Sequence, residues 1–341
     1  MTWDIFCTVI DNFGDIGVTW RLARQLATEH RLAVRLWVDD LGAFRQIRPE
    51  IDPTLDLQHL AGVEIRRWTS PLPEAKPGEV VVEALACNLP DEFVARMAAR
   101  VPKPVWINLE YLTAEDWARG VHGLPSPHPR QPLTKFFFMP GYGPGTGGLT
   151  REANLARQRE AFQASPADQA AFWARLGVPP RTSGEARVSL FSYENAALPE
   201  LLAAWADADS PVRILIPQGK VLPQIANWFG LAGLPEPGSS LVRGKLAVHI
   251  LPMLDQDGYD RLLWACDLNF VRGEDSFVRA QFAARPLVWQ AYRQEEEAHF
   301  AKLEAFLDLY CGRMDTDLAE LTRRIWRAWN RETDIGALWP A

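Results

Sequence analysis

The sequence has few cysteines and histidines, and it carries no excess of positive charge. Its four cysteines form no CxxC pair, which is typical of reduced, mostly buried thiols in a cytoplasmic protein. The six histidines form neither an HExxH nor an HxH motif, so we expect no histidine-built metal site. With 36 Lys and Arg against 43 Asp and Glu, the formal net charge is −7. This balance argues against general binding of nucleic acid or of an anionic membrane, and it suits a basic partner.

Long apolar runs are also missing. No stretch of about 18 uncharged apolar residues occurs, so we expect no transmembrane helix. The opening MTWDIFCTVIDNFGD has no basic segment and reaches Asp4 at once, so we expect no signal peptide. Apolar residues nevertheless make up 48% of the 341 residues. Because a domain usually holds about 100–200 residues, two packed domains are expected.

Strand-like and helix-like segments alternate in two series along the chain. We predict buried strands at 3–10, 31–40, 80–84 and 105–109, and then at 187–193, 212–217, 245–252, 268–271 and 286–290. Strands that alternate with helices predict parallel sheets covered by helices. We therefore predict an α/β protein of two Rossmann-like domains facing a cleft, at 1–155 and 180–320. A C-terminal helix at about 320–341 is expected to pack back on the first domain.

Residues 120–148 differ from both series because they are dense in Pro and Gly. They include HGLPSPHPRQPLT and MPGYGPGTGGLT, which predict irregular structure. Two interpretations stay open for this segment. It is either a functional loop that docks a partner protein, together with Glu110 and Tyr111 just upstream, or a solvated connector.

The loop after the first strand, residues 11–17, lies where a dinucleotide-binding fold has its phosphate loop. It holds only a GxxG fragment, and Asp11 and Asp15 would repel a diphosphate. We expect it to bind a neutral sugar or a cationic group, with Gly14 and Gly17 allowing close approach of the backbone. The alternative is that one of the two aspartates caps the following helix.

A second polar cluster, residues 272–276, follows the strand at 268–271 and opens a helix. A helix N-terminus binds phosphates through its free N–H groups, and Ser276 adds a hydroxyl. Arg272 can make a bidentate contact with a diphosphate, and Glu274 can accept from sugar hydroxyls. The alternative is ordinary helix capping within a solvated charge cluster.

Two aromatic-bearing loops leave neighbouring strands of the second domain at the same sheet edge. Phe191 and Tyr193 lie in one, and Gln256 and Tyr259 lie in the other. Their rings could stack on a nucleobase. Each aromatic residue could equally belong to the core.

Three of these segments are similar to those of a known family. WDIFCTVIDNFGDIGVTWRLARQL, SLFSYEN and DLNFVRGEDSFVRAQFAARPLVWQ resemble the EarP family of bacterial protein-arginine rhamnosyltransferases, and the resemblance runs along the full chain. That family modifies translation elongation factor P (EF-P) and has a GT-B-like fold. The resemblance implies inverting transfer of L-rhamnose from dTDP-β-L-rhamnose to an arginine side chain of EF-P, with neither a metal nor a cofactor.

The resemblance also implies roles for individual residues. Asp11 would be the general base, Asp15 a second essential acid, and Glu274 a support for catalysis from the donor side. The remaining residues would bind the nucleotide sugar: Gly14, Gly17, Phe191, Tyr193, Gln256, Tyr259, Arg272, Gly273, Asp275 and Ser276. One departure is that no aromatic residue stands shortly before Gln256, where the chain reads Leu251-Pro252-Met253.

The residues alone leave other classes of function open. A nucleotide-sugar epimerase or phosphorylase of the same fold would need no protein acceptor. A non-catalytic module would only hold a protein partner, and Asp11, Asp15 and Glu274 argue against it. A nicotinamide oxidoreductase is disfavoured by the acidic residues of the first loop.

Overall fold

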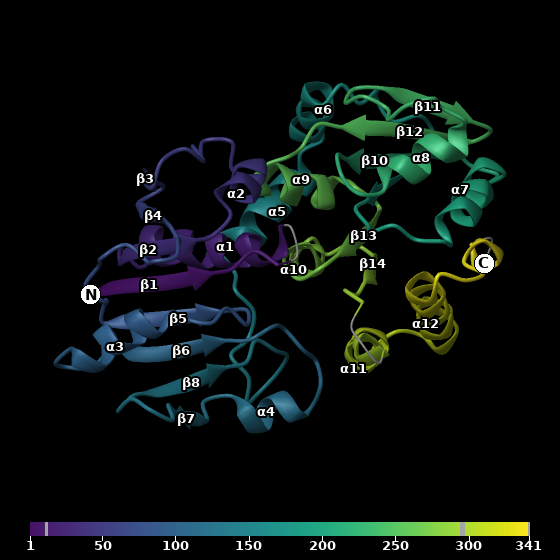
Figure 1. The fold of residues 1–341 in the computed structure, drawn as a ribbon. Helices are drawn as coiled ribbons and strands as arrows, with labels where there is room; N and C mark the ends of the chain where they lie inside the picture. The colour runs from purple at the N-terminus through teal and green to yellow at the C-terminus, as the bar shows by residue number, and fades with distance from the viewer. Residues whose placement is uncertain (11–12, 294–296, 340–341) are drawn as a thin grey trace. The chain divides into compact units, whose positions relative to one another are not determined.

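The structure is a computed structural model of the chain, and it describes residues 1–10, 13–293 and 297–339. The chain divides into two compact units, Met1–Ala153 and Asn154–Ala341 (Figure 1). Each unit is built around one sheet that is parallel except at its edges. The two predicted Rossmann-like folds are thereby confirmed, unit by unit.

The first unit contains an eight-stranded sheet in the order β3-β4-β2-β1-β5-β6-β8-β7. Without the antiparallel edge strands β3 and β7, the six parallel strands have the order 3-2-1-4-5-6 of a dinucleotide-binding fold. The elements are β1 (Thr2–Cys7), α1 (Gly14–Thr28), β2 (Ala33–Val38), α2 (Leu41–Ile47), β3 (Leu57–Leu60), β4 (Val63–Arg67), β5 (Val80–Ala84), α3 (Asp91–Ala99), β6 (Val105–Leu109), α4 (Trp117–Val121), β7 (Pro125–Pro127) and β8 (Thr134–Phe138).

The central strands β1, β2 and β5 are largely buried, so apolar residues are found on both faces of this sheet. Phe6 of β1 stacks on Trp37 of β2 with ring centroids 5.4 Å apart, and Phe93 of α3 closes over both rings. Neighbouring residues in a strand point to opposite faces, so Ile5 and Cys7 face away from this cluster. Helix α1 packs on β1 and β2.

The segment rich in Pro and Gly is more regular than the sequence predicts. Residues 120–148 contain β7 and β8, and β8 pairs with β6 in parallel. Two of the three residues of β7 are proline, which an edge strand tolerates because it needs few ladder N–H groups. Of the glycines that follow, Gly147 lies against the end of β8, where a Cβ would collide with the ring of Phe138. The prediction of wholly irregular structure was therefore wrong.

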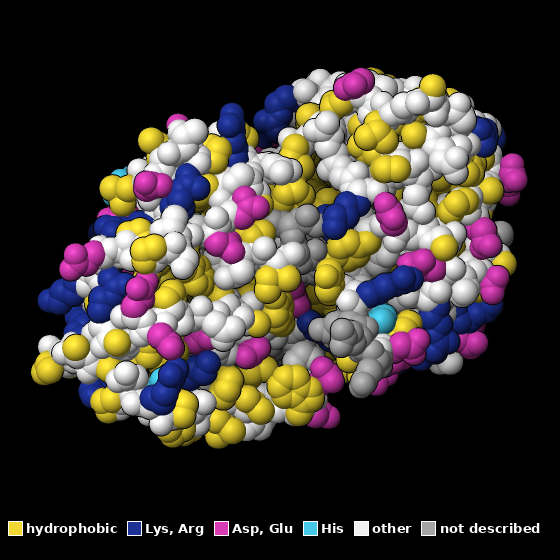
Figure 2. Space-filling view, viewed as in Figure 1, with side chains coloured by type: hydrophobic (Ala, Val, Ile, Leu, Met, Phe, Trp, Pro, Cys, Tyr) yellow, Lys and Arg dark blue, Asp and Glu magenta, His cyan; other side chains and the backbone are white. Residues whose placement is uncertain are grey.

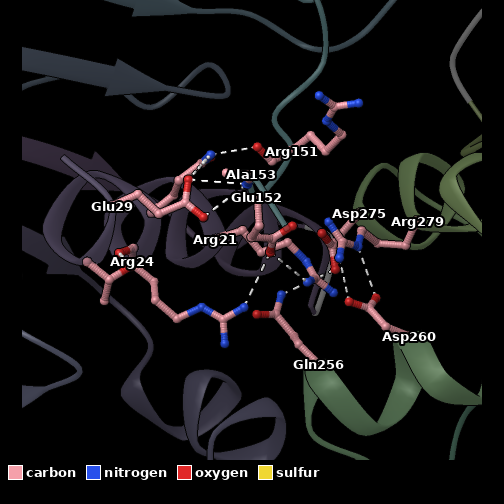
Figure 3. A network of polar contacts seen from close by, with 12 residues as sticks. Arg21, Arg24, Glu29, Arg151, Glu152, Ala153, Gln256, Asp260, Asp275 and Arg279 are labelled. Carbon is pink, nitrogen blue, oxygen red and sulfur yellow. Dashed lines mark hydrogen bonds and ion pairs between the residues drawn. The ribbon is translucent and has the colours of Figure 1, made fainter. Parts of the chain in front are cut away.

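The last residues of the first unit are fixed on α1. The guanidinium groups of Arg21 and Arg24 lie 3.5 and 3.3 Å from the Glu152 carboxylate. At the other end of the helix, Glu29 accepts a hydrogen bond from the Ala153 N–H (Figure 3). These contacts hold the chain in place up to the boundary between the units.

The second unit contains a six-stranded sheet in the order β11-β12-β10-β9-β13-β14. Without the antiparallel edge strand β11, the parallel strands have the order 3-2-1-4-5. The elements are α5 (Leu155–Ala164), α6 (Pro166–Arg175), β9 (Ala186–Leu190), α7 (Leu198–Ala206), β10 (Val212–Pro217), α8 (Leu222–Phe229), β11 (Ser240–Arg243), β12 (Leu246–Leu251), α9 (Gln256–Ala265), β13 (Leu268–Arg272), α10 (Asp275–Phe282), β14 (Leu287–Gln290), α11 (Ala298–Cys311), α12 (Thr316–Arg331) and the 3-10 helix η2 (Gly336–Leu338).

The C-terminal helix α12 belongs to the second unit through its buried aromatic face. Trp329 packs edge-on against Phe270 of β13, with ring centroids 5.0 Å apart. The side chain of Asn330 donates a hydrogen bond to the carbonyl of Trp289, which lies in β14. It also accepts a hydrogen bond from the N–H of Ala291, the first residue after that strand. The sequence analysis expected this helix to pack on the first domain, but the aromatic packing on β13 and β14 groups it with the second unit.

All four cysteines are free and buried, as their wide spacing predicts. Burial raises the pKa of the Cys87 thiol to about 12 and that of Cys7 well above its usual value. These groups are therefore neutral at physiological pH and behave as small apolar side chains. Among the described residues, no helix has both the length and the apolar character needed to cross a bilayer.

Candidate functional site

Each unit has a topological switch point, where the strand order reverses direction. In the first unit, β1 lies between β2 and β5, and in the second, β9 lies between β10 and β13. Ligands of open α/β sheets bind beside the carboxyl ends of the strands at such points. Both polar clusters that the sequence analysis selected follow strands at these two positions: Asp15 follows β1, and Arg272 ends β13.

In the second unit, the structure brings Arg272 together with the two aromatic residues that follow β9. The Arg272 guanidinium carbon lies 4.6 Å from the ring centroid of Phe191 and 4.3 Å from that of Tyr193. A planar guanidinium stacked on aromatic faces binds anions through its N–H edge. Arg272 is only 5% exposed, so the arrangement is largely fixed before any ligand binds.

Residues 273–276 form the turn from β13 into α10. Gly273 has a φ of +64°, a backbone conformation that favours glycine. The Ser276 hydroxyl donates to the Arg272 carbonyl and accepts from the Arg272 N–H, which closes the turn. Glu274 is the N-cap residue, yet its side chain makes no capping hydrogen bond. Because Ser276 is buried and Glu274 is half-buried, the alternative of ordinary capping in a solvated cluster is not what the structure contains.

Helix α9 adds the residues that the sequence analysis expected from the neighbouring loop. Gln256 is the first residue of α9, and its side-chain amide donates to Asp275 at 3.2 Å. One turn further along each helix, Asp260 and Arg279 form a buried ion pair, with Arg279 Nε 2.9 Å from Asp260 Oδ1 (Figure 3). The starts of α9 and α10 are thus held side by side by two successive contacts.

Tyr259 completes the aromatic part of this site. Its ring packs edge-on against Phe191 with centroids 5.6 Å apart. Burial raises the pKa of Tyr259, so its hydroxyl stays neutral and can donate a hydrogen bond. The neighbouring Ser276 hydroxyl partly offsets this effect of burial.

Three contributors to this site were missed from the sequence. Trp289 and Gln290 end strand β14, and Lys302 lies in α11. Gln290 accepts from the Tyr193 N–H at 2.9 Å, and Trp289 donates to the Gly273 carbonyl at 3.0 Å. The pairing of β14 beside β13 was a signal for the first two, because neighbouring parallel strands end at the same edge. Nothing in the local sequence marks Lys302.

In the first unit, Asp15 lies in the first turn of α1 and is 1% exposed. Its Oδ2 accepts from the Ile10 N–H at 2.8 Å, and its Oδ1 is 3.2 Å from the Tyr111 hydroxyl. The N-cap of α1 is Phe13, so Asp15 is not the capping residue that the alternative interpretation required. Its carboxylate instead faces the ends of the strands.

The same edge carries backbone strain between β5 and α3. Leu85 and Ala86 both have positive φ, +54° and +61°, although neither is glycine. Such conformations cost about 1–3 kcal/mol each and gather at functional sites. The Leu85 carbonyl lies 3.2 Å from the Tyr111 hydroxyl, which connects the strained turn to Asp15.

The other predicted residues of the first loop are only partly covered by the structure. Gly14 and Gly17 lie in the first turn of α1, and the Gly17 N–H donates to the Phe13 carbonyl at 2.8 Å. Asp11 lies outside the described residues, so its predicted role as the general base stays a prediction. Within the described chain, no group of three His, Cys, Asp or Glu side chains is arranged to hold a metal ion.

Comparison with known proteins identifies the family of the chain. The family model described as Elongation-Factor P (EF-P) rhamnosyltransferase EarP matches residues 3–341. A protein-arginine rhamnosyltransferase of Pseudomonas aeruginosa is 53% identical over 338 residues, which cover 99% of this chain and 89% of the relative. That of Pseudomonas putida is 52% identical over 341 residues, covering 100% of this chain and 89% of the relative.

One solved structure, which describes EarP-mediated arginine glycosylation of translation elongation factor EF-P, has the same fold. It is 38% identical, covers 99% of this chain and 87% of the solved chain, and superposes with a TM-score of 0.68. The α/β architecture of two Rossmann-like domains is that of the GT-B glycosyltransferases. The chain is therefore a glycosyltransferase, a protein-arginine rhamnosyltransferase that belongs to the EarP family.

Proposed function

We propose that the chain transfers L-rhamnose from dTDP-β-L-rhamnose to an arginine side chain of EF-P, with inversion at the sugar and with no metal ion. The observation that carries this proposal is the convergence of Arg272, Phe191 and Tyr193 at the switch point of the second unit. A cation between aromatic faces, at the start of a helix, suits a nucleoside diphosphate. EF-P is named in the family description and in the related solved structure.

The second unit would bind the donor. In this proposal Arg272 and the N-terminus of α10 hold the diphosphate, with Ser276 and Asp275 beside it. Phe191, Tyr193, Gln256 and Tyr259 would surround the base and the sugar. As the bond between the sugar and the phosphate oxygen breaks, negative charge builds up on the departing dTDP. Arg272 and the helix N-terminus would stabilise that charge.

The first unit would bind the acceptor. A guanidinium has a pKa of about 12.5 or more, so it arrives protonated and is a poor nucleophile. Asp11 and Asp15 would attract and orient this cation, and their charge favours the protonated form. Asp11 would therefore take the proton only as the nitrogen bonds to the anomeric carbon, when that nitrogen becomes more acidic. Positioning of this kind can supply up to about 7–11 kcal/mol of the barrier reduction.

Inversion requires the base and the leaving group to act from opposite sides of the anomeric carbon. The candidate base and the candidate anion site belong to different units of the chain. The net charge of −7 suits a basic acceptor region. A cytoplasmic location and the absence of direct contacts with nucleic acid or membrane belong to the same proposal.

The direct test is intact-mass analysis of EF-P after incubation with the protein and dTDP-rhamnose. A gain of one rhamnose on EF-P, absent when the acceptor arginine is changed to lysine, supports the proposal. Sugar turnover without an acceptor would point to an epimerase or phosphorylase. Binding of EF-P without any mass gain would point to a non-catalytic module.

The donor site gives a first quantitative prediction. Arg272→Ala should weaken dTDP binding by about 1.5–3 kcal/mol, or roughly 10- to 100-fold in Kd, because a charge-assisted contact is lost. Ser276→Ala should have a smaller effect, since its hydroxyl also bonds to the Arg272 backbone. Calorimetric titration with dTDP measures both.

A matched control lies at the far edge of the same sheet. Arg243 lies on the edge strand β11. Its guanidinium carbon is 4.0 Å from the Trp228 ring centroid and 5.3 Å from that of Phe229. Arg243→Ala removes a cation from two rings in the same way and should leave dTDP affinity unchanged. Unaltered affinity in both Arg272→Ala and Ser276→Ala would remove residues 272–276 from the donor site.

A second prediction concerns docking of EF-P on the first unit. We propose that residues 120–148, with Glu110 and Tyr111, contact the partner. Large apolar side chains are exposed in and beside this segment, namely Trp117, Leu124, Phe136 and Phe138. Figure 2 shows apolar side chains gathered where Figure 1 places α4 and β7. Exposed apolar patches of this kind mark sites of protein interaction.

Hydrogen exchange with and without EF-P tests this docking proposal. Amides of residues 120–148 should exchange more slowly in the presence of EF-P, and the edge strand β11 of the second unit should not change. If protection is confined to other segments, residues 120–148 are a connector and the docking proposal fails.

A further inference from the structure

The turn that carries Glu274 is supported by the end of β14. Trp289 is 2% exposed, and its indole N–H donates to the Gly273 carbonyl at 3.0 Å. Its ring stacks on Phe277 of α10 with centroids 4.0 Å apart and planes within 11°. The backbone of the turn is therefore fixed by a rigid aromatic pair, and Gly273 has little freedom to move.

The side chain of Glu274 needs a separate support, because the helix does not provide one. Glu274 makes no capping hydrogen bond to α10. Its Oε1 instead accepts from the ammonium group of Lys302 in α11 at 2.6 Å. The side chain of Glu274 is only 14% exposed and that of Lys302 only 19%. The Lys302 nitrogen lies 5.9 Å from the Trp289 ring centroid. An ion pair that is largely withdrawn from water orients its partners better than a surface pair does.

We propose that Lys302 is a positioning residue that fixes the carboxylate of Glu274 for its work on the donor side. This inference rests on the proposed function, together with the support of catalysis from the donor side that the family resemblance implies for Glu274. A glutamate has several freely rotating bonds, and ordering them during the reaction would add to the barrier. The ammonium group of Lys302 orders them beforehand. It also keeps one carboxylate oxygen engaged, which leaves the other oriented toward a ligand.

A double-mutant cycle on transfer to EF-P separates positioning from plain structural support. Lys302→Met keeps the apolar stem but removes the charge. It should lower kcat roughly 10- to 100-fold, because misplacing a reacting group by about 1 Å costs that much. In a Glu274→Gln background the same change should alter kcat by less than about twofold, since the group that Lys302 positions is already altered. If Lys302 had a purely structural role, its substitution would lower kcat by the same factor in both backgrounds.

Two further variants control for charge and for stability. Lys302→Arg keeps a cation that can bind a carboxylate and should recover most of the lost rate. Arg327→Met breaks another ion pair of the same helix, in which Arg327 bonds Glu304 of α11 through two contacts of 2.7 Å. It should lower the melting temperature but leave kcat unchanged.

The outcomes of this experiment are distinct. Equal losses of kcat in both backgrounds overturn the positioning role while leaving the proposed function intact. A Glu274→Gln protein with the wild-type rate removes Glu274 from catalysis and the inference with it. A wild-type protein that transfers no rhamnose overturns the proposed function itself.

Discussion

Changing Asp15 to asparagine is expected to lower the single-turnover rate of arginine rhamnosylation at least about 10²-fold and to leave dTDP affinity unchanged. The carboxylate is buried in the first turn of α1, where the Ile10 N–H and the Tyr111 hydroxyl orient it. A negative charge withdrawn from water attracts a guanidinium strongly. Asparagine has nearly the same shape but no charge, so the acceptor would be neither attracted nor aligned. The donor site belongs to the other unit and should not respond.

A buried acid on the neighbouring strand β1 provides the matched control. Asp4 is fully buried and accepts from Arg35, from the Trp37 indole N–H and from the Gly78 N–H at 2.7–2.9 Å. Asp4→Asn should lower the melting temperature without changing the rate of the folded protein. If Asp15→Asn behaves like Asp4→Asn, with lost stability and an unchanged rate, Asp15 is a structural acid.

The parts of the fold that could be predicted are those with a strong local pattern. The strands at 80–84, 105–109 and 212–217 have the predicted bounds, because each is mostly apolar and largely buried. The edge strands β3 and β11 are mostly exposed, so no apolar run marks them. Strand β8 was hidden for another reason: its Pro- and Gly-rich neighbours dominate the local pattern, although TKFFF itself favours a strand.

The residues of the site also divide into those that could be predicted from the sequence and those that could not. Arg272, Phe191 and Tyr193 could be selected because each lies in or just after the last residues of a predicted strand, and parallel strands end at a common edge. Lys302 could not, because its contact with Glu274 spans 28 residues and depends on where α11 packs. The ion pair between Asp260 and Arg279 was hidden for a similar reason, since it joins the second turns of two helices. Long-range pairing of single side chains leaves no periodic signal in a sequence.

Changing Asp11 to asparagine is the sharpest test of the proposed mechanism. Asparagine keeps the size and much of the hydrogen bonding of aspartate but cannot take a proton from the guanidinium. If Asp11 is the general base, the transfer rate should fall at least about 10²-fold, the usual contribution of such a group. Affinity for dTDP should barely change. The melting temperature should hold or rise, because one of two neighbouring carboxylates loses its charge.

A structural role for Asp11 predicts the opposite pattern. Loss of a helix cap costs about 1 kcal/mol of folding stability and leaves activity largely intact. Single-turnover transfer, donor titration and a thermal melt on one preparation of the Asp11→Asn protein distinguish the two roles. Because the donor titration reports separately on the second unit, a slow variant with normal dTDP affinity locates the defect on the acceptor side. Wild-type turnover by Asp11→Asn would refute general-base catalysis by this residue, while the family membership of the chain would stand.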